Sequence, residues 1–141
     1  MSEHKIVLLT GSSGKLGTAI VHSNTRFTLL KPSSNKLDIT NSKKIKDYFN
    51  RYNFSAIIHC AAMARMGQCE NNPRDAIKVN ILGTANLVNA TIMKGNIRFI
   101  HISTDGVYYC DRGNYKENDE TIPYNIYGWT KLGSETAVRI L

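Results

Sequence analysis

The sequence predicts a doubly wound parallel α/β fold in which helices cover both faces of one sheet. Three observations predict it. Short apolar runs alternate along the chain with longer segments of helical periodicity, and each run is apolar on both faces, as is typical of strands in a covered parallel sheet. The chain also has 141 residues, of which 42% are hydrophobic, which is enough for one core. We therefore expect a single domain over residues 1–141.

The first half of the chain contains three of the expected strands. Ser12 and Ser13 follow the first strand and are expected to open the first helix. The second helix has apolar residues at spacings of three and four, which indicates a face in the core rather than a site. The expected elements are strands over residues 5–10, 27–30 and 56–60, a turn over 32–35, and helices over 15–23 and 42–52.

The second half continues the alternation of strands and helices without internal repeats. The expected elements are a loop over residues 63–70, a helix over 73–94, a strand over 97–103, a polar loop over 111–118 and a closing helix over 125–141. Strands joined by helices of this length are parallel, because a parallel connection needs a long crossover.

Charge, targeting signals and cysteines exclude several classes of partner. The net charge of +7 comes from 18 basic and 11 acidic residues, but the basic residues are spread over the chain, which argues against a nucleic-acid surface. The first five residues lack the features of a signal peptide, and the apolar stretches are too short to cross a bilayer. The three cysteines have no zinc-ligand spacing. We expect a cytoplasmic protein with no nucleic-acid, membrane or metal partner.

The first strand ends in a glycine series, Gly11-x-x-Gly14-x-x-Gly17. The first glycine permits a sharp turn, the second lets the backbone approach a pyrophosphate, and the third allows close packing of helix on strand. Glycines also ease ordinary turns, but a strand before the series and a helix after it favour dinucleotide binding. The expected phosphate site comprises Gly11, Ser12, Ser13, Gly14, Lys15, Leu16 and Gly17.

Tyr127 and Lys131 lie four residues apart on the last expected helix and therefore share one face. A neighbouring ammonium favours the phenolate, which brings a tyrosine toward acid–base chemistry at neutral pH. A Tyr-x-x-x-Lys pair also occurs by chance in a chain of this composition. Its weight comes from Ser103-Thr104-Asp105, which ends a preceding strand where a hydroxyl can hold a substrate carbonyl.

Six motifs span nearly the whole chain. They are Gly11-x-x-Gly14-x-x-Gly17, Leu37-Asp38-Ile39-Thr40, Ile58-His59-Cys60-Ala61-Ala62, Val79-Asn80-x-x-Gly83-Thr84-x-Asn86-Leu87, His101-Ile-Ser-Thr-Asp105 and Tyr127-Gly-Trp-Thr-Lys131-Leu132-Gly133-Ser134-Glu135. In this order and spacing they resemble the extended short-chain dehydrogenase/reductases. Among these, the sequence is most similar to the dTDP-4-dehydrorhamnose reductase family. The resemblance implies a Rossmann-type NAD(P)-binding domain.

The resemblance also implies roles for individual residues. Tyr127 is expected to donate a proton, Thr104 to position the carbonyl oxygen, and Lys131 to lower the tyrosine pKa and hold the nicotinamide ribose. Hydride would come from the cofactor, because no protein group can deliver one. Two interpretations of Asn80 stay open: it takes a direct part in the site, or it is a helix residue whose side chain satisfies nearby backbone groups. The remaining implied cofactor contacts are Asp38 and Ile39 at the adenine, and the backbones of Ala61, Ala62 and Met63.

Cofactor choice depends on the residues near the adenosine ribose. An acid after the second strand binds the 2′-hydroxyl of NAD, whereas a base accepts the 2′-phosphate of NADP. No acid lies there, and the strand is followed by Lys31, Ser33, Ser34 and Lys36. We expect NADP(H), with NAD(H) as the alternative.

The sequence departs from the family on the substrate side and in length. Met63-Ala64-Arg65-Met66-Gly67-Gln68 replaces the family's usual aromatic, threonine and acid–base pair, and Gly106 stands where tyrosine commonly follows Ser-Thr-Asp. The family's chains are longer, and their later half supplies most of the sugar-nucleotide pocket. We expect this chain to be the N-terminal part of a longer protein without the substrate domain; a natural half is the alternative.

These observations favour an NAD(P)H-dependent reductase of a nucleotide-linked 4-keto sugar. A nucleotide-sugar epimerase or dehydratase with tightly bound NAD shares the same tyrosine and lysine. A cofactor-binding regulatory subunit without turnover is a third hypothesis, favoured by the altered substrate-side residues. The nucleotide sugar is the expected small-molecule partner, and a homodimer is left open.

Overall fold

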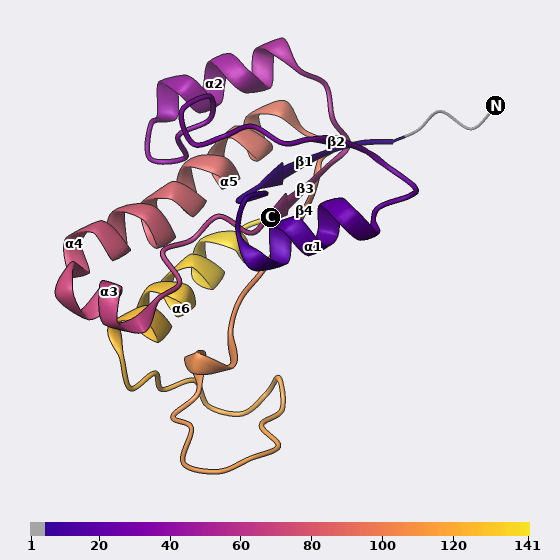
Figure 1. The fold of residues 1–141 in the computed structure, drawn as a ribbon. Coiled ribbons are helices and arrows are strands. Elements are labelled where there is room, and N and C mark those ends of the chain that lie inside the picture. Colours follow the sequence, from indigo (N-terminus) through magenta and orange to yellow (C-terminus); the bar gives the residue numbers. More distant parts are fainter. Residues whose placement is uncertain (1–4) are drawn as a thin grey trace.

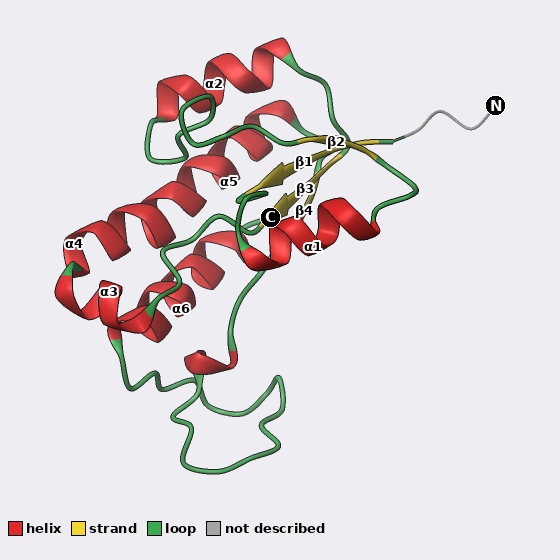
Figure 2. Cartoon of the chain, in the orientation of Figure 1, coloured by secondary structure: helices red, strands yellow, loops and turns green. Residues whose placement is uncertain are grey.

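The computed structural model describes residues 5–141, and its centre is a sheet of parallel strands (Figures 1 and 2). The strands are β1 (Ile6–Thr10), β2 (Thr28–Leu30), β3 (Ala56–His59) and β4 (Arg98–His101), in the order β2-β1-β3-β4. All three strand pairs are parallel, so the predicted parallel sheet is confirmed. The prediction of no signal peptide falls mainly on residues 1–4, outside the described residues.

Helices cover both faces of this sheet, as predicted (Figure 1). From β1 the chain moves to β2 on one side of it, and the later connections, to β3 and β4, move in the opposite direction across the sheet. Because these crossovers are right-handed, the helix of the first connection and the helices of the later ones lie on opposite faces. Helix α1 lies on one face, while α2, α5 and α6 pack together on the other. The helices are α1 (Lys15–Ser23), α2 (Ser42–Arg51), α3 (Met66–Asn71), α4 (Pro73–Ala76), α5 (Gly83–Lys94) and α6 (Ile126–Val138), with the π-helix η1 (Ile77–Leu82) and the 3₁₀ turn η2 (Asp105–Val107).

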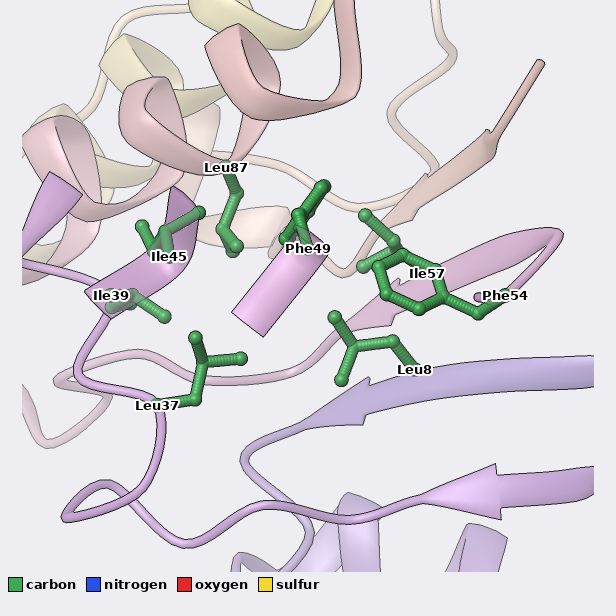
Figure 3. Close-up of a cluster of buried hydrophobic side chains, with 8 residues drawn as sticks. All are labelled: Leu8, Leu37, Ile39, Ile45, Phe49, Phe54, Ile57 and Leu87. Carbon is green, nitrogen blue, oxygen red and sulfur yellow. The ribbon is translucent and has the colours of Figure 1, made fainter. Parts of the chain in front are cut away.

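The main core lies between the sheet and the helices α2 and α5 (Figure 3). Leu8 of β1 and Ile57 of β3 are paired neighbours in the sheet and are both fully buried. The predicted apolar stripe of α2 packs here, with Ile45 and Phe49 buried. Asn41 sets the start of that helix, because its side chain accepts a hydrogen bond from the Lys44 N–H. The full cluster comprises Leu8, Leu37, Ile39, Ile45, Phe49, Phe54, Ile57 and Leu87.

The helix expected over 73–94 is confirmed as α4, η1 and α5, with the π-helical segment at its centre. Two other local predictions were wrong. The loop expected over 63–70 contains the helix α3, in which the Arg65 carbonyl accepts a hydrogen bond from the Cys69 N–H and the Gln68 carbonyl accepts one from the Asn72 N–H. Helix α1 is not opened by a serine side chain; its N-cap is Gly14, without a side-chain cap.

Strand β4 ends the sheet within the described residues, since it pairs only with β3. Ile100 of this strand is 41% exposed. The polar loop between η2 and α6 projects from the body of the molecule (Figure 2). In the part of the chain that the structure describes, we find no helix with the length and apolarity that a membrane crossing requires.

Candidate active site

The glycine loop joins β1 to α1 at the carboxyl end of the sheet. Gly11 has a φ of +69°, a backbone conformation that side chains disfavour, and a Cβ there would lie 2.6 Å from the Ala61 nitrogen. A Cβ on Gly17 would lie 2.2 Å from the Gly11 carbonyl oxygen. Both positions therefore require glycine, and α1 approaches the loop as closely as the backbone allows.

The N-terminus of α1 faces the space above the sheet. Its N-cap, Gly14, provides no side-chain acceptor, so the first-turn N–H groups are not capped by a side chain. The N-terminal end of a helix carries partial positive charge, which favours an anion such as a pyrophosphate. A Cβ on Gly14 would meet only the Gly11 oxygen, at 3.4 Å. The loop thus provides an open cradle of backbone donors.

A first cavity of about 500 Å³ extends from this loop toward the end of β2. Of the residues noted after the second strand, Lys31, Ser33 and Ser34 line it, whereas Lys36 does not. Most residues predicted to contact the adenosine half and the phosphates of a dinucleotide also lie here. They are Gly11, Ser12, Ser13, Gly14, Asp38, Ile39, Ala61 and Ala62.

The Asp38 carboxylate has a structural task of its own. Its Oδ1 accepts hydrogen bonds from the Thr40 N–H at 2.9 Å and from the Thr40 hydroxyl at 2.8 Å. These bonds hold the pKa of Asp38 below its ordinary value, with smaller contributions from Lys44 and Lys78. The carboxylate is therefore ionised and fixes the turn that places Ile39 in the cavity wall.

A second cavity of about 610 Å³ adjoins the first and shares Gly11, Gly14, Cys60 and Ala62 with it. The structure brings residues from four parts of the chain together here. They are Lys15, Leu16 and Gly17 of α1, Met63 after β3, Ile102 and Ser103 after β4, and Tyr127 and Lys131 of α6. The predicted glycine loop and the predicted Tyr–Lys pair therefore lie along one continuous cleft.

Tyr127 lies in the first turn of α6, which starts at Asn125. The Asn125 side chain accepts a hydrogen bond from the Gly128 N–H at 2.8 Å, and a Cβ on Gly128 would lie 2.2 Å from the Gly106 oxygen. This close approach brings Tyr127 to the loop of Thr104. Burial raises the pKa of Tyr127, and a hydrogen bond with Thr104 acts in the opposite direction. Thr104 itself lies outside the residues that line the cavity.

The Lys131 side chain is buried, with 3% of its surface exposed. Its Nζ donates to the Ile102 carbonyl oxygen at 2.5 Å and lies 3.3 Å from His101 Nε2. Burial lowers the pKa of Lys131 to about 8, while Glu135 and Cys60 oppose that shift. The ammonium is thus directed at the end of β4, and the lowering of the Tyr127 pKa expected from Lys131 is not found, because that pKa is raised.

Asn80 lies in the π-helix η1 and is 2% exposed. Its Oδ1 accepts from the Met63 N–H at 2.8 Å, and its Nδ2 donates to the Met63 carbonyl at 3.1 Å and to the Thr130 hydroxyl at 2.9 Å. Asn80 does not line either cavity. Its amide links the loop after β3 to the helix that carries Tyr127 and Lys131.

Sequence reasoning missed a row of buried and half-buried polar side chains under the cleft. Thr10, His59 and His101 occupy paired positions on β1, β3 and β4. His59 Nδ1 lies 2.7 Å from the Thr10 hydroxyl, and its Nε2 lies 3.0 Å from the Thr84 hydroxyl. The sequence contained a signal for this row, because each of these polar residues lies at the end of an apolar run. Cys60, one of the three cysteines without zinc-ligand spacing, lines both cavities.

Known proteins share both the sequence and the fold. The chain is 35% identical over 136 residues to the dTDP-4-dehydrorhamnose reductase of Mycolicibacterium smegmatis, covering 94% of this chain and 41% of that protein. It is 32% identical over 142 residues to the methionine adenosyltransferase 2 subunit beta of Pongo abelii, covering 94% and 42%. The crystal structure of dTDP-4-dehydrorhamnose reductase from Bacillus anthracis in complex with NADP superposes with a TM-score of 0.94 at 30% identity, covering 100% of this chain and 51% of that one.

The resemblance predicted from the six motifs is confirmed by these similarities. The chain spans about half the length of the relatives it matches. A family described as the RmlD substrate binding domain matches residues 5–140. The chain therefore belongs to the RmlD substrate binding domain family.

Proposed function

We propose that the protein reduces the keto group of a nucleotide-linked 4-keto sugar with NADPH, and that this chain is its cofactor-binding part. The observation that carries the proposal is the continuous cleft, which runs from Lys31 past the glycine loop to Tyr127 and Lys131. The similarity to dTDP-4-dehydrorhamnose reductases supports the reaction class.

The residues of the cleft fit a dinucleotide. The uncapped start of α1 provides donors for a pyrophosphate, and Gly14 keeps a side chain out of that space. Lys31, Ser33 and Ser34 offer a cation and two hydroxyls to the 2′-phosphate of NADP(H). The Bacillus anthracis reductase was solved in complex with NADP, which supports the same preference here over NAD(H).

In the proposed reaction the chain's own residues handle the proton. Bound NADPH supplies the hydride. Tyr127 donates its phenolic proton to the carbonyl oxygen, and Thr104 holds that oxygen through its hydroxyl. The raised pKa of Tyr127 keeps the phenol protonated and ready to donate at neutral pH. Lys131 of α6, whose Nζ lies at the end of β4, would hold the nicotinamide ribose.

The test is NADPH-dependent reduction of a dTDP-linked 4-keto sugar by the full-length natural protein. Tyr127→Phe removes the donated proton and leaves the ring, so we expect kcat to fall by about 100-fold or more. NADPH binding should persist in this variant. Tyr124→Phe is a matched control, because Tyr124 is 57% exposed and does not line the cleft. Full activity of Tyr127→Phe would exclude the proposed proton donor.

A second candidate is a cofactor-binding regulatory subunit without turnover. The similarity to methionine adenosyltransferase 2 subunit beta favours it, as do the departures at Arg65 and Gly106 on the substrate side. Trp129 lies on α6 between Tyr127 and Lys131 and can report binding by its fluorescence. NADPH-dependent quenching without reduction of any 4-keto sugar nucleotide would select this candidate over the reductase.

We further infer a cytoplasmic protein. The described cysteines form no disulfide, which fits a reducing compartment, and a nucleotide sugar as substrate fits the same location. A homodimer is the oligomer we propose, to be tested by sedimentation of the full-length protein.

A further inference from the structure

A buried polar cluster behind Lys131 has no part in the chemistry proposed above. Its centre is His101, the last residue of β4. His101 Nε2 lies 3.3 Å from Lys131 Nζ and 2.9 Å from the Ser134 hydroxyl. His101 Nδ1 is buried and has no hydrogen-bond partner among the described residues. All polar contacts of the ring therefore go to one helix, α6.

We propose that His101 is a positioning residue that, together with Ser134, holds the Lys131 ammonium group at the carboxyl end of β4. The inference rests on the proposed function, in which Lys131 contacts the cofactor. Lys131 has a long side chain with many rotamers, and a fixed Nζ requires partners on more than one side. The Ile102 carbonyl provides one partner and the His101 ring provides the second.

The hydrogen atoms of this cluster can be assigned from donors and acceptors. The Ser134 hydroxyl donates to the Lys131 carbonyl oxygen at 2.6 Å, so its oxygen is left to accept from His101 Nε2. The Lys131 ammonium also faces Nε2 and has only protons to offer. A single nitrogen thus faces one group that requires a donor and one that requires an acceptor.

The protonation state of Lys131 determines which nitrogen of the His101 ring carries the proton. When Lys131 is charged, Nε2 accepts from the ammonium, and the ring proton is on Nδ1. When Lys131 releases its proton to water, the ring proton moves to Nε2 and is donated to Ser134. The tautomer of His101 is therefore coupled to the charge of Lys131.

The surrounding groups leave His101 neutral in both states. Burial and the Lys131 charge lower the pKa of His101 to about 4. His59 of β3 stacks on the ring at 5.5 Å between centroids, and burial lowers the pKa of His59 to about 3. The other titratable groups that face Lys131 are Cys60 after β3 and, on α6, Tyr127 and Glu135. A change at His101 near pH 8 therefore reports Lys131 rather than protonation of the ring.

Nuclear magnetic resonance of the chain without cofactor tests the coupling. The ¹⁵N shifts of the His101 ring should exchange between the two tautomers, with a midpoint at the Lys131 pKa of about 8. In His101→Phe the acceptor is lost, so the Lys131 pKa, followed by its ¹³Cε shift, should fall by roughly one unit. His101→Gln places an amide oxygen near the former Nε2 and should restore the pKa.

His101→Asn is a second loss variant, because its shorter amide does not reach Lys131 and its polar group limits disruption of the fold. An unchanged Lys131 pKa in both loss variants would overturn the proposal, as would an equal fall in His101→Gln. NADPH quenching of Trp129 in the unaltered chain tests cofactor binding separately. Coupling without NADPH binding would therefore refute the proposed function while confirming the contact between His101 and Lys131.

Discussion

Asn80 illustrates how one buried amide can serve a site that it does not face. All its hydrogen-bonding groups are used, two on the backbone of Met63 and one on Thr130. These partners lie 17 and 50 residues away in sequence. The amide therefore satisfies the backbone of Met63, as one of its two sequence-based interpretations held, and it also ties the loop after β3 to α6 through Thr130.

Replacement of Asn80 by alanine should destabilise the fold. The Met63 N–H and carbonyl would be left without their partner, and a buried unpaired polar group costs roughly 1–3 kcal/mol. We expect the free energy of unfolding, measured with urea, to fall by about 2–4 kcal/mol. Asn89→Ala is the control, since Asn89 is exposed on α5. An equal loss in both variants would contradict the bridging role.

Because His59 is buried and neutral, we expect the folded protein to lose stability in acid. Thr10 accepts from the Ala61 N–H, and the Thr84 hydroxyl donates to the Asn80 carbonyl, so the ring between them is neutral with its proton on Nε2. Burial lowers its folded-state pKa to about 3, below the unfolded value. The unfolded chain therefore binds the extra proton between these values, and stability falls as the pH drops below about 6.5.

The slope from this one residue approaches about 1.4 kcal/mol per pH unit. Urea unfolding between about pH 4.5 and 7 should show it. His59→Gln removes the titrating group, so its profile should be flatter than that of the unaltered chain. A profile of the same steepness in His59→Gln would place the acid sensitivity elsewhere.

At the scale of elements, the position of α1 depends on the absence of a single methyl group. Gly17 lies against the backbone of the loop that starts the same helix. The three glycines were identified from sequence because each task, a positive φ, an open cradle or a close approach, excludes a side chain. The π-helix in the segment from Pro73 to Lys94 was not identifiable, because its hydrophobic pattern also fits a regular helix.

Gly17→Ala should push α1 away from the loop. The new methyl would lie 2.2 Å from the Gly11 oxygen, and overpacking of this kind costs roughly 1–3 kcal/mol. We expect a lower melting temperature and loss of NADPH quenching of Trp129. Gly67→Ala is a matched control on α3, where a Cβ meets no atom within 4 Å. NADPH binding of equal strength in both variants would refute the role of close packing.

At the scale of the whole molecule, β4 is an edge strand of the sheet formed by the described residues. Strand β4 has a neighbour only at β3, and Ile100 and Arg98 are exposed. An unpaired strand edge beside an exposed apolar side chain favours association. The relatives are about twice as long as this chain.

We predict that the 141-residue chain self-associates through this edge. Ile100→Lys should shift sedimentation toward the monomer, because the charge must be desolvated when strands pair. Met93→Lys introduces the same charge on α5, where Met93 is 79% exposed, and should leave the association unchanged. A monomeric unaltered chain at all concentrations would show that the edge is not an association surface.

The parallel α/β alternation, the glycine loop and the family were all predictable from the amino-acid sequence. Hydrophobic periodicity and glycine spacing are local properties, readable within a few residues. The side chains that meet under the cleft became apparent only once the chain was folded. His101 and Lys131 are 30 residues apart, Asn80 and Thr130 are 50 apart, and such pairs depend on the order of strands in the sheet and on the packing of α6. The Lys131 ammonium therefore has partners that its motif does not name, because a motif fixes spacing along the chain but not contacts across the fold.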